Sequence, residues 1–198
     1  KKYLSNNNYQ IINTYKIFEL ESINKKTDAI FNRSKINNII RINKFHERIN
    51  AKMNKDGIYI ICGETNDERS LRIKNKIFFG FKNIYIVFDF FVKRVMPKLV
   101  GFKQMYFFFT KGKNRILSKA EMIGRLVSCG FDIIECFEDN NIFYIISKKN
   151  REPEYDMNAS YGPLFRMKRI GYKGKIIGVY KLRTMYPYSE YCQEYITK

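Results

Sequence analysis

The 198-residue sequence has no tryptophan, a single histidine and only four cysteines. The cysteines are widely scattered, and no two of them are spaced as a CxxC pair. This pattern, without a recognisable signal peptide, indicates a reducing environment and neither structural disulfides nor a zinc site. Cys62 and Cys129 lie in apolar segments and are expected to be reduced core thiols. His46 lacks partner residues at metal-ligand spacing, so we interpret it as a surface residue of a helix.

A long hydrophobic run is also missing. No stretch of about 20 apolar residues is uninterrupted, so a simple transmembrane helix is not expected. The nearest approach, residues 77–100, is interrupted by Lys82, Asn83 and Asp89 and becomes basic around Pro97. Two interpretations stay open: a helix lying in a membrane interface, or an amphipathic helix packed on the domain's own sheet.

Acidic residues are few, with 19 Asp and Glu against 37 Lys and Arg, a net charge of +18. Such an excess favours polyanionic partners, although a solvated basic surface would look the same. No helix-turn-helix, zinc-finger or aromatic RNA-binding signature is present, so no specific nucleic-acid partner is expected. The apolar fraction of 45%, with 17 Phe and 15 Tyr, is enough for a real core.

The first quarter of the chain gives a mixed pattern. Residues 1–14 are polar and rich in asparagine, and we expect them to be irregular. The short segments 15–20 and 28–32 have the composition of strands. Residues 34–54 carry apolar side chains at helical spacing, with Ser34 placed as the N-cap of a predicted helix.

Strands and helices are then expected to alternate. Asp56-Gly57 predicts a turn into the apolar run GIYIICGE, which is typical of a buried parallel strand. A helix is predicted around residues 70–96 and a strand at 105–110. The order of these elements is that of an α/β protein.

Local signals are strongest near residues 118–148. Ser118 and Glu121 form a capping box at the start of a helix, and Gly130 stands where a glycine follows a helix end. Asn140-Asn141 separates two strand segments and predicts a hairpin turn.

The segments DGIYIICGE, SKAEMIGRLVSCGF and NIFYIISKK occur in the order seen in the second half of a class I methyltransferase. Residues 15–150 resemble that half, so we expect a partial Rossmann-like domain over residues 1–148, ending in a β-hairpin. In that family a glycine-rich loop and a ribose-binding acid come earlier, and no G-x-G occurs in this chain. The resemblance therefore leaves S-adenosylmethionine binding unsupported.

Residues 149–160 are polar and aperiodic and are interpreted as a linker. Residues 161–185 then predict a basic β-hairpin, with seven cations and no acid between Gly162 and Met185. Cations gathered in this way favour an anionic ligand, and glycines at the turn would let phosphate oxygens approach the backbone. A solvated basic hairpin is the alternative.

This segment closely resembles the start of the bacterial sugar transferase domain of polyprenyl-phosphate phosphoglycosyl transferases, whose hallmark is approximately GPVFFRQERVG-x-NGKPFKIYKFRTM. The spacing from Gly171 to Met185 needs no gap. The matching positions are Gly162-Pro163, Phe165-Arg166, Arg169-Ile170-Gly171, Gly174-Lys175 and Tyr180-Lys181-Leu182-Arg183-Thr184-Met185.

The resemblance implies transfer of a sugar phosphate from a nucleotide sugar to undecaprenyl phosphate, at the cytoplasmic face of the bacterial inner membrane, in cell-surface polysaccharide synthesis. It implies a Mg²⁺-dependent route through a phosphosugar on an aspartate. Arg166, Arg169, Lys181 and Arg183 are the residues to which phosphate contact is assigned.

Two features depart from the family pattern. Its Asp-Glu dyad follows the KFRTM element, so we expect the dyad beyond Lys198 and this chain alone to be inactive and to hold no cofactor. The family's re-entrant hydrophobic helix is replaced here by polar residues, which leaves residues 77–100 as the candidate for membrane contact. Two other functions remain open: a degenerate methyltransferase-like binding module without catalysis, and a basic nucleic-acid-binding protein.

Overall fold

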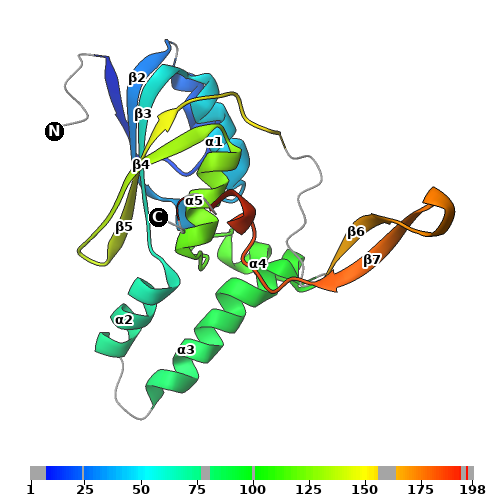
Figure 1. Cartoon of the computed structure of the whole chain (residues 1–198). Coiled ribbons are helices and arrows are strands. Elements are labelled where there is room, and N and C mark those ends of the chain that lie inside the picture. The colour runs from blue at the N-terminus through cyan, green and yellow to red at the C-terminus, as the bar shows by residue number, and fades with distance from the viewer. Residues whose placement is uncertain are drawn as a thin grey trace.

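A computed structural model of the chain describes residues 8–23, 25–76, 81–99, 101–155, 164–192 and 195. A five-stranded mixed sheet forms its centre, with strand order β1-β2-β3-β5-β4 (Figure 1). The first three strands are parallel, and β5 runs antiparallel to both of its neighbours, β3 and β4. The strands are β1 Tyr9–Ile12, β2 Thr27–Lys35, β3 Met53–Gly63, β4 Phe131–Asp139 and β5 Ile142–Lys149.

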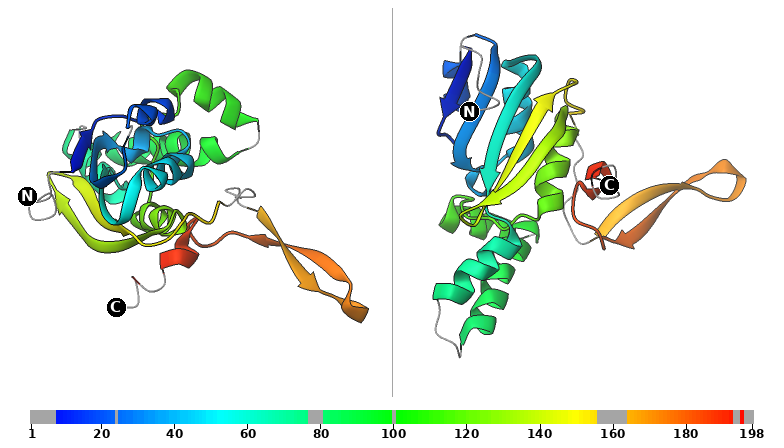
Figure 2. Two further views of the ribbon diagram at one scale, coloured as in Figure 1. Left: turned by 90° about the horizontal axis from the view of Figure 1, so that it is seen from above. Right: turned by 60° about the vertical axis from the view of Figure 1, so that its left-hand side comes forward.

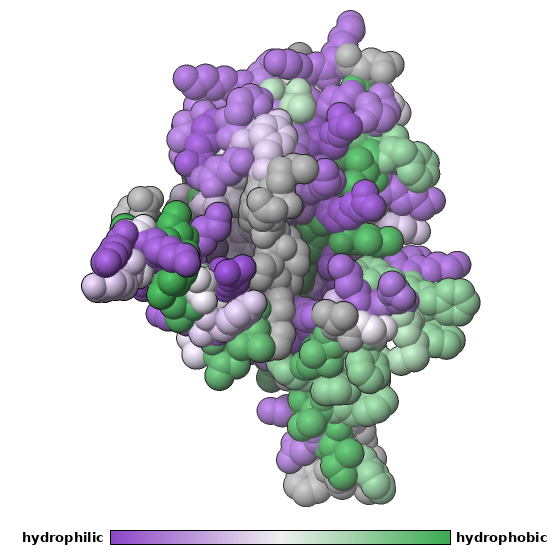
Figure 3. Space-filling model, turned by 90° about the vertical axis from the view of Figure 1, so that its right-hand side faces the viewer, coloured by the Kyte–Doolittle hydropathy of each residue, from purple (hydrophilic) through white to green (hydrophobic). Residues whose placement is uncertain are grey.

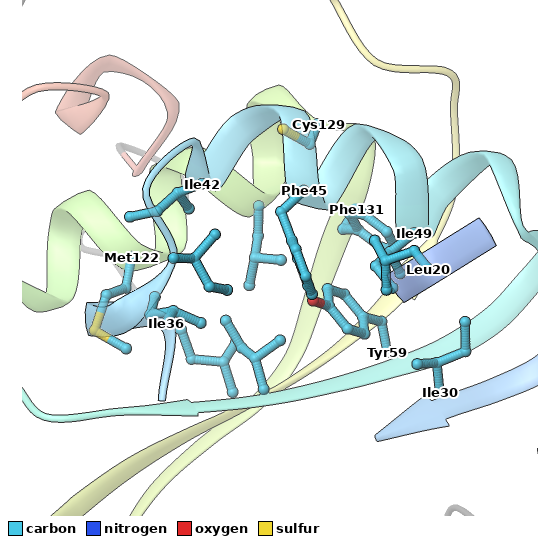
Figure 4. Packing of buried hydrophobic residues seen from close by; sticks show 14 of the residues in the cluster. Leu20, Ile30, Ile36, Ile42, Phe45, Ile49, Tyr59, Met122, Cys129 and Phe131 are labelled. Carbon is cyan, nitrogen blue, oxygen red and sulfur yellow. The ribbon is translucent and has the colours of Figure 1, made fainter. Parts of the chain in front are cut away.

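Two helices, α1 (Ile42–Ala51) and α5 (Lys119–Ser128), cover one face of this sheet. Phe45 of α1 lies beside Tyr59 of β3, and Met122 of α5 belongs to the same fully buried cluster (Figure 4). Tyr59 also contacts Phe131 at a ring-centroid distance of 5.2 Å. The GIYIICGE run is therefore a central buried strand, as predicted, with one parallel and one antiparallel neighbour.

The local signals around α5 are confirmed. The Ser118 hydroxyl accepts a hydrogen bond from the Glu121 N–H at 3.2 Å, which caps the first turn. Gly130 adopts φ +87° just after the helix, a conformation that glycine takes without strain. Asn140 and Asn141 adopt φ values of 49° and 59° and join β4 to β5, as the predicted hairpin requires.

Three predictions near the amino terminus are wrong. Residues 15–20 contribute to a 3-10 turn, Ile17–Ser22, and not to a strand, whereas the supposedly irregular amino-terminal segment contains β1. The helix expected at 34–54 begins only at Ile42, because the chain continues in β2 to Lys35, which pairs with β3. Ser34 consequently donates to the Asn13 side chain at 2.8 Å and caps no helix.

Two further predictions need correction. Asp56-Gly57 lies inside β3, where Asp56 has φ 61° and the register with β2 shifts, so it is a bulge and not an initiating turn. Residues 105–110, expected as a strand, belong to helix α4 (Phe102–Thr110). Their aromatic side chains suit a half-buried strand, yet Phe108 and Phe109 are exposed and join no sheet.

The predicted 70–96 helix is split into shorter pieces that extend beyond the sheet (Figures 1 and 2). Helix α2 (Asn66–Lys76) lies beside α3 (Lys82–Phe90). A π-helical turn, Phe91–Val95, and a 3-10 turn, Met96–Lys98, carry the chain from α3 toward α4.

The predicted basic hairpin is present. Strands β6 (Leu164–Ile170) and β7 (Ile176–Leu182) pair antiparallel and extend away from the sheet (Figure 2). Part of the predicted linker, 156–160, and the Gly162-Pro163 step lie outside the described residues. After β7 the chain returns to the α/β domain, where Ser189–Cys192 packs against α5.

Candidate anion-binding sites

The hairpin distributes its cations over both faces. Arg166 lies opposite Tyr180, and Arg169 lies opposite Ile177 on the other face, because successive strand residues alternate. Lys181 shares the face of Arg169 but lies four residues along β7 from Ile177, which is about 13 Å at the usual strand rise. Four predicted phosphate contacts are thus spread along the hairpin and do not converge on one point.

Arg166 lies across the backbone of Gly178. A Cβ atom placed on Gly178 would come within 1.9 Å of the Arg166 Nε, so any other residue there would displace the guanidinium. The glycine of IIGVYKLRTM therefore makes room for an arginine on the neighbouring strand. This contact fixes one cation of the motif on the surface of the hairpin.

Arg183 follows β7 and lies where the chain turns back to the α/β domain. The next residues dock closely: the Tyr188 hydroxyl accepts a hydrogen bond from Asn43 Nδ2 at 2.7 Å. The Tyr188 ring lies 4.8 Å from the Arg125 guanidinium, and its backbone approaches Gly124 too closely for any Cβ there. The transferase-like segment is thereby anchored to α5 and not held apart from the first domain.

A cavity of about 700 Å³ lies beside this anchor. It is built by the segment before and at the start of α1, by the turn around Pro97, by the start of α4 and by α5. Eight cationic side chains line it against two acidic ones. The cations are Arg41, Lys44, Lys93, Arg94, Lys98, Lys103, Arg115 and Arg125, and the acids are Glu47 and Glu121.

Glu121 is the most deeply buried acid in this cavity wall. Arg94 donates to its Oε2 at 2.5 Å, and Arg125 donates to its Oε1 at 2.9 Å. Burial alone would raise the pKa of the Glu121 carboxyl, but the charges of Arg125, Arg94 and Lys98 outweigh it and lower that pKa to about 2. Arg125 also donates to the Asn43 Oδ1 at 2.5 Å, which ties α5 to α1.

Lys98 lines the same cavity. Its burial, together with the nearby charges of Arg94, Arg125 and Arg183, lowers the pKa of Lys98 to about 8, although Glu121 opposes the change. Arg183, from the transferase-like motif, therefore acts electrostatically on the wall of the cavity. An anion placed beside Lys98 would relieve this mutual repulsion.

Helix α3 buries its acidic side chain and exposes apolar ones. Asp89 is 5% exposed and is held by Arg69, with oxygen–nitrogen distances of 2.6 and 3.0 Å. Ile84, Val87 and Phe88 are 69%, 68% and 64% exposed. The interpretation of residues 77–100 as packed on the domain's own sheet is therefore wrong for α3, whose charge faces inward. Green side chains accordingly gather over the lower end of the molecule, while hydrophilic ones cover its upper end (Figure 3).

The buried histidine corrects another prediction. His46 is fully buried in α1, with Nδ1 lying 3.3 Å from the Tyr59 hydroxyl, and is no surface residue. Burial and the charge of Arg125 lower the pKa of His46 to about 3, so the ring is neutral near pH 7. Cys62 and Cys129 are buried free thiols, as predicted.

The described residues provide neither a metal-ligand cluster nor a membrane-spanning helix. No cluster of three or more His, Cys, Asp or Glu side chains there is arranged to hold a metal ion. Across the same ranges, no helix combines the length and the apolar character needed to cross a bilayer.

The sequence reasoning missed the cavity as a site. Three of its cations, Lys93, Arg94 and Lys98, were visible as the basic residues around Pro97, but the residues that line the cavity are far apart along the chain. Asn43 and Arg125, for example, are separated by 82 positions. Only the fold brings them to one wall.

Comparison with known proteins adds no assignment. No protein-family model matches the chain, and no match is found among the curated proteins.

Proposed function

We propose that the chain is the N-terminal part of an enzyme that transfers a sugar phosphate from a nucleotide sugar to a polyprenyl phosphate in cell-surface polysaccharide synthesis. The observation that carries this proposal is the ungapped similarity of Gly171–Met185 to the hallmark of the sugar transferase family. The strand pairing from Leu164 to Leu182 supports it, since the matched residues within that range form one regular hairpin.

The hairpin cations would bind the phosphates of the substrates. Arginine grips a phosphate through two parallel N–H donors, and lysine adds a compact charge. Arg166, Arg169, Lys181 and Arg183 are assigned this role, with Arg166 and Arg169 serving opposite faces. The described residues hold no cluster of three or more His, Cys, Asp or Glu side chains for a metal ion, and we assign the hairpin cations binding and charge neutralisation.

The surface of α3 and α4 supports a membrane location for this enzyme. Ile84, Val87 and Phe88 project outward from α3, and Phe108 and Phe109 project from α4. Lys82 begins α3, and Lys111 directly follows α4. Exposed apolar side chains beside cations suit the interface of an anionic bilayer, which supports our proposal that this surface contacts the cytoplasmic face of the inner membrane.

For the α/β domain we propose descent from a methyltransferase fold. Its β5 supports this origin, because β5 is the last strand of the sheet in sequence and forms an antiparallel hairpin with β4, as the final hairpin of that fold does. The cationic cavity argues against retained S-adenosylmethionine binding, because that cofactor carries a sulfonium charge. A non-catalytic module remains the second candidate.

The test is a transfer assay with protein made from the complete gene, in membranes containing undecaprenyl phosphate. A panel of radiolabelled nucleotide sugars should include at least one donor that yields a labelled, lipid-extractable product. Lys181→Ala and Arg183→Ala should each reduce this transfer at least 100-fold, because phosphate charge then lacks a partner in the transition state. The product is counted after solvent extraction.

Lys173→Ala is the matched control, since it removes one charge from the tip of the same hairpin and lies outside the assigned set. It should retain most of the activity. Turnover at the wild-type rate in both motif variants would remove the phosphate role. Absence of transfer from every donor would refute the proposed activity.

A further inference from the structure

The cavity between α1, α5 and the turn around Pro97 is lined mainly by residues of the α/β domain, and none of its lining residues belongs to the set assigned to phosphate contact in the transfer. Its size, about 700 Å³, is that of a pocket for a small organic ligand. It lies among the segments that follow the carboxyl end of β2, where α/β sheets commonly bind ligands.

The charge of this cavity needs an anionic counterpart. Of its ten charged lining residues, eight are cations, and the Glu121 carboxylate is already shared between Arg94 and Arg125. Gathering like charges around a partly enclosed space is unfavourable unless a ligand neutralises them. In the described part of the chain, no hydrogen bond joins the Lys98 ammonium to another residue.

The amino-terminal end of α1 contributes to the same wall. Its first residues line the cavity, and the helix begins with no side-chain cap and no acid in its first turn. Free N–H groups at a helix start attract anions through the helix dipole. Arg41 and Lys44 flank this start, so the backbone and the side chains favour the same kind of ligand.

The remaining walls are apolar. Ile40, Pro97, Leu99 and Phe107 line the cavity next to the cations. A bare inorganic ion would leave this surface in contact with water. An anionic group attached to an organic portion would cover both kinds of surface.

We propose that this cavity binds a ligand that carries a diphosphate group joined to an apolar or aromatic portion, with Lys98 and Lys103 contacting the diphosphate. Such chemistry occurs in a free nucleoside diphosphate and in an isoprenoid diphosphate. The site would give the α/β domain a ligand of its own, whether or not the hairpin belongs to a transferase.

Calorimetric titration of the chain tests the proposal with uridine diphosphate, farnesyl diphosphate and inorganic pyrophosphate as probes. At least one organic diphosphate should bind, and more tightly than pyrophosphate, because only it also covers the apolar wall. Tighter binding of uridine diphosphate would indicate a nucleotide source, and tighter binding of farnesyl diphosphate a lipid source. Lys98→Gln and Lys103→Gln should each weaken this binding at least tenfold.

Binding should also take up protons near pH 8, because an anion beside Lys98 raises its pKa against Arg94, Arg125 and Arg183. Titration in two buffers of different ionisation enthalpy measures that uptake, which Lys98→Gln should abolish. Lys168→Gln, the same charge change on the hairpin, should leave affinity and uptake unchanged. Absence of binding by all three probes, equal affinity in every variant, or preference for S-adenosylmethionine would overturn the proposal. Failure of the transfer assay would leave this result unaffected.

Discussion

Among single residues, Glu121 makes the sharpest electrostatic contribution. It is buried between Arg94 and Arg125, and removing its charge would leave two buried guanidinium groups without their carboxylate. We expect Glu121→Gln to lower the free energy of unfolding by about 3 kcal/mol at pH 7. Urea denaturation followed by circular dichroism measures the change.

The loss of unfolding free energy in Glu121→Gln should depend on pH. Because the folded-state pKa of Glu121 is lowered to about 2, its contribution is complete above the unfolded pKa of about 4.3 and is lost as pH falls toward 2. The difference between wild type and Glu121→Gln should therefore be smaller at pH 3 than at pH 7. Glu138→Gln, which breaks an exposed pair with Lys119, should cost under about 1 kcal/mol at either pH. A pH-independent difference for Glu121 would contradict this account.

At the scale of elements, α3 is the unusual one, because its outward face is apolar while Asp89 faces inward. Val87→Ser with Phe88→Ser should reduce binding to phosphatidylglycerol-containing vesicles more than tenfold, since each buried side chain of this size contributes about 2 kcal/mol. The free energy of unfolding should hardly change, because both side chains are exposed. Vesicle co-sedimentation at several lipid concentrations gives the affinities.

A matched pair tests whether this effect is specific to α3. Ile11 and Phe18 are also exposed but lie near the amino terminus, on β1 and the 3-10 turn after it. Ile11→Ser with Phe18→Ser removes comparable apolar surface and should leave vesicle binding intact. If the two pairs lose affinity equally, or neither does, α3 is not the membrane contact.

Sequence reasoning succeeded where a structure is specified locally. Ser118 marks the start of α5 and Gly130 follows its end, while Asn140-Asn141 makes the turn between β4 and β5. These residue types favour the required backbone conformations by themselves. The prediction of a helix was wrong at 34–41. The isoleucines there have helical spacing, but the chain pairs with β3 as far as Lys35 and the isoleucines that follow are buried in the core. The strand predicted at 105–110 was wrong for a related reason. A segment with the composition of a strand forms one only where a neighbouring strand is available to pair with it.

The candidate sites divide in the same way. The basic hairpin could be read directly from residues 164–182, because both strands and their turn are contiguous. The cavity could not, because Asn43, Lys98, Arg125 and Arg183 come together only through tertiary packing. The prediction that His46 lies on the surface was wrong for the same reason, because its neighbour Tyr59 lies on another element and is brought to it by tertiary packing.

For the molecule as a whole, the hairpin and the segment after it should contribute very differently to stability. Side chains of β6 and β7 such as Ile170 and Leu182 are exposed, and an isolated two-stranded hairpin is marginal in water. Tyr188, in contrast, is buried against α5 and hydrogen-bonded to Asn43. Stability should therefore depend on the returning segment and not on the hairpin.

Replacing residues 164–182 with a four-residue Gly-Ser linker tests this, because Leu164 and Leu182 are register partners about 5 Å apart. The free energy of unfolding in urea should change by less than about 0.5 kcal/mol. Tyr188→Ala should lower it by about 3 kcal/mol, since it removes a buried ring and leaves Asn43 without that partner. A loss above about 2 kcal/mol on replacing the hairpin would mean that β6 and β7 pack on the α/β domain. A small loss on replacing the hairpin, with a large loss for Tyr188→Ala, would mean that the hairpin can bind an anionic ligand without contributing to the stability of the α/β domain.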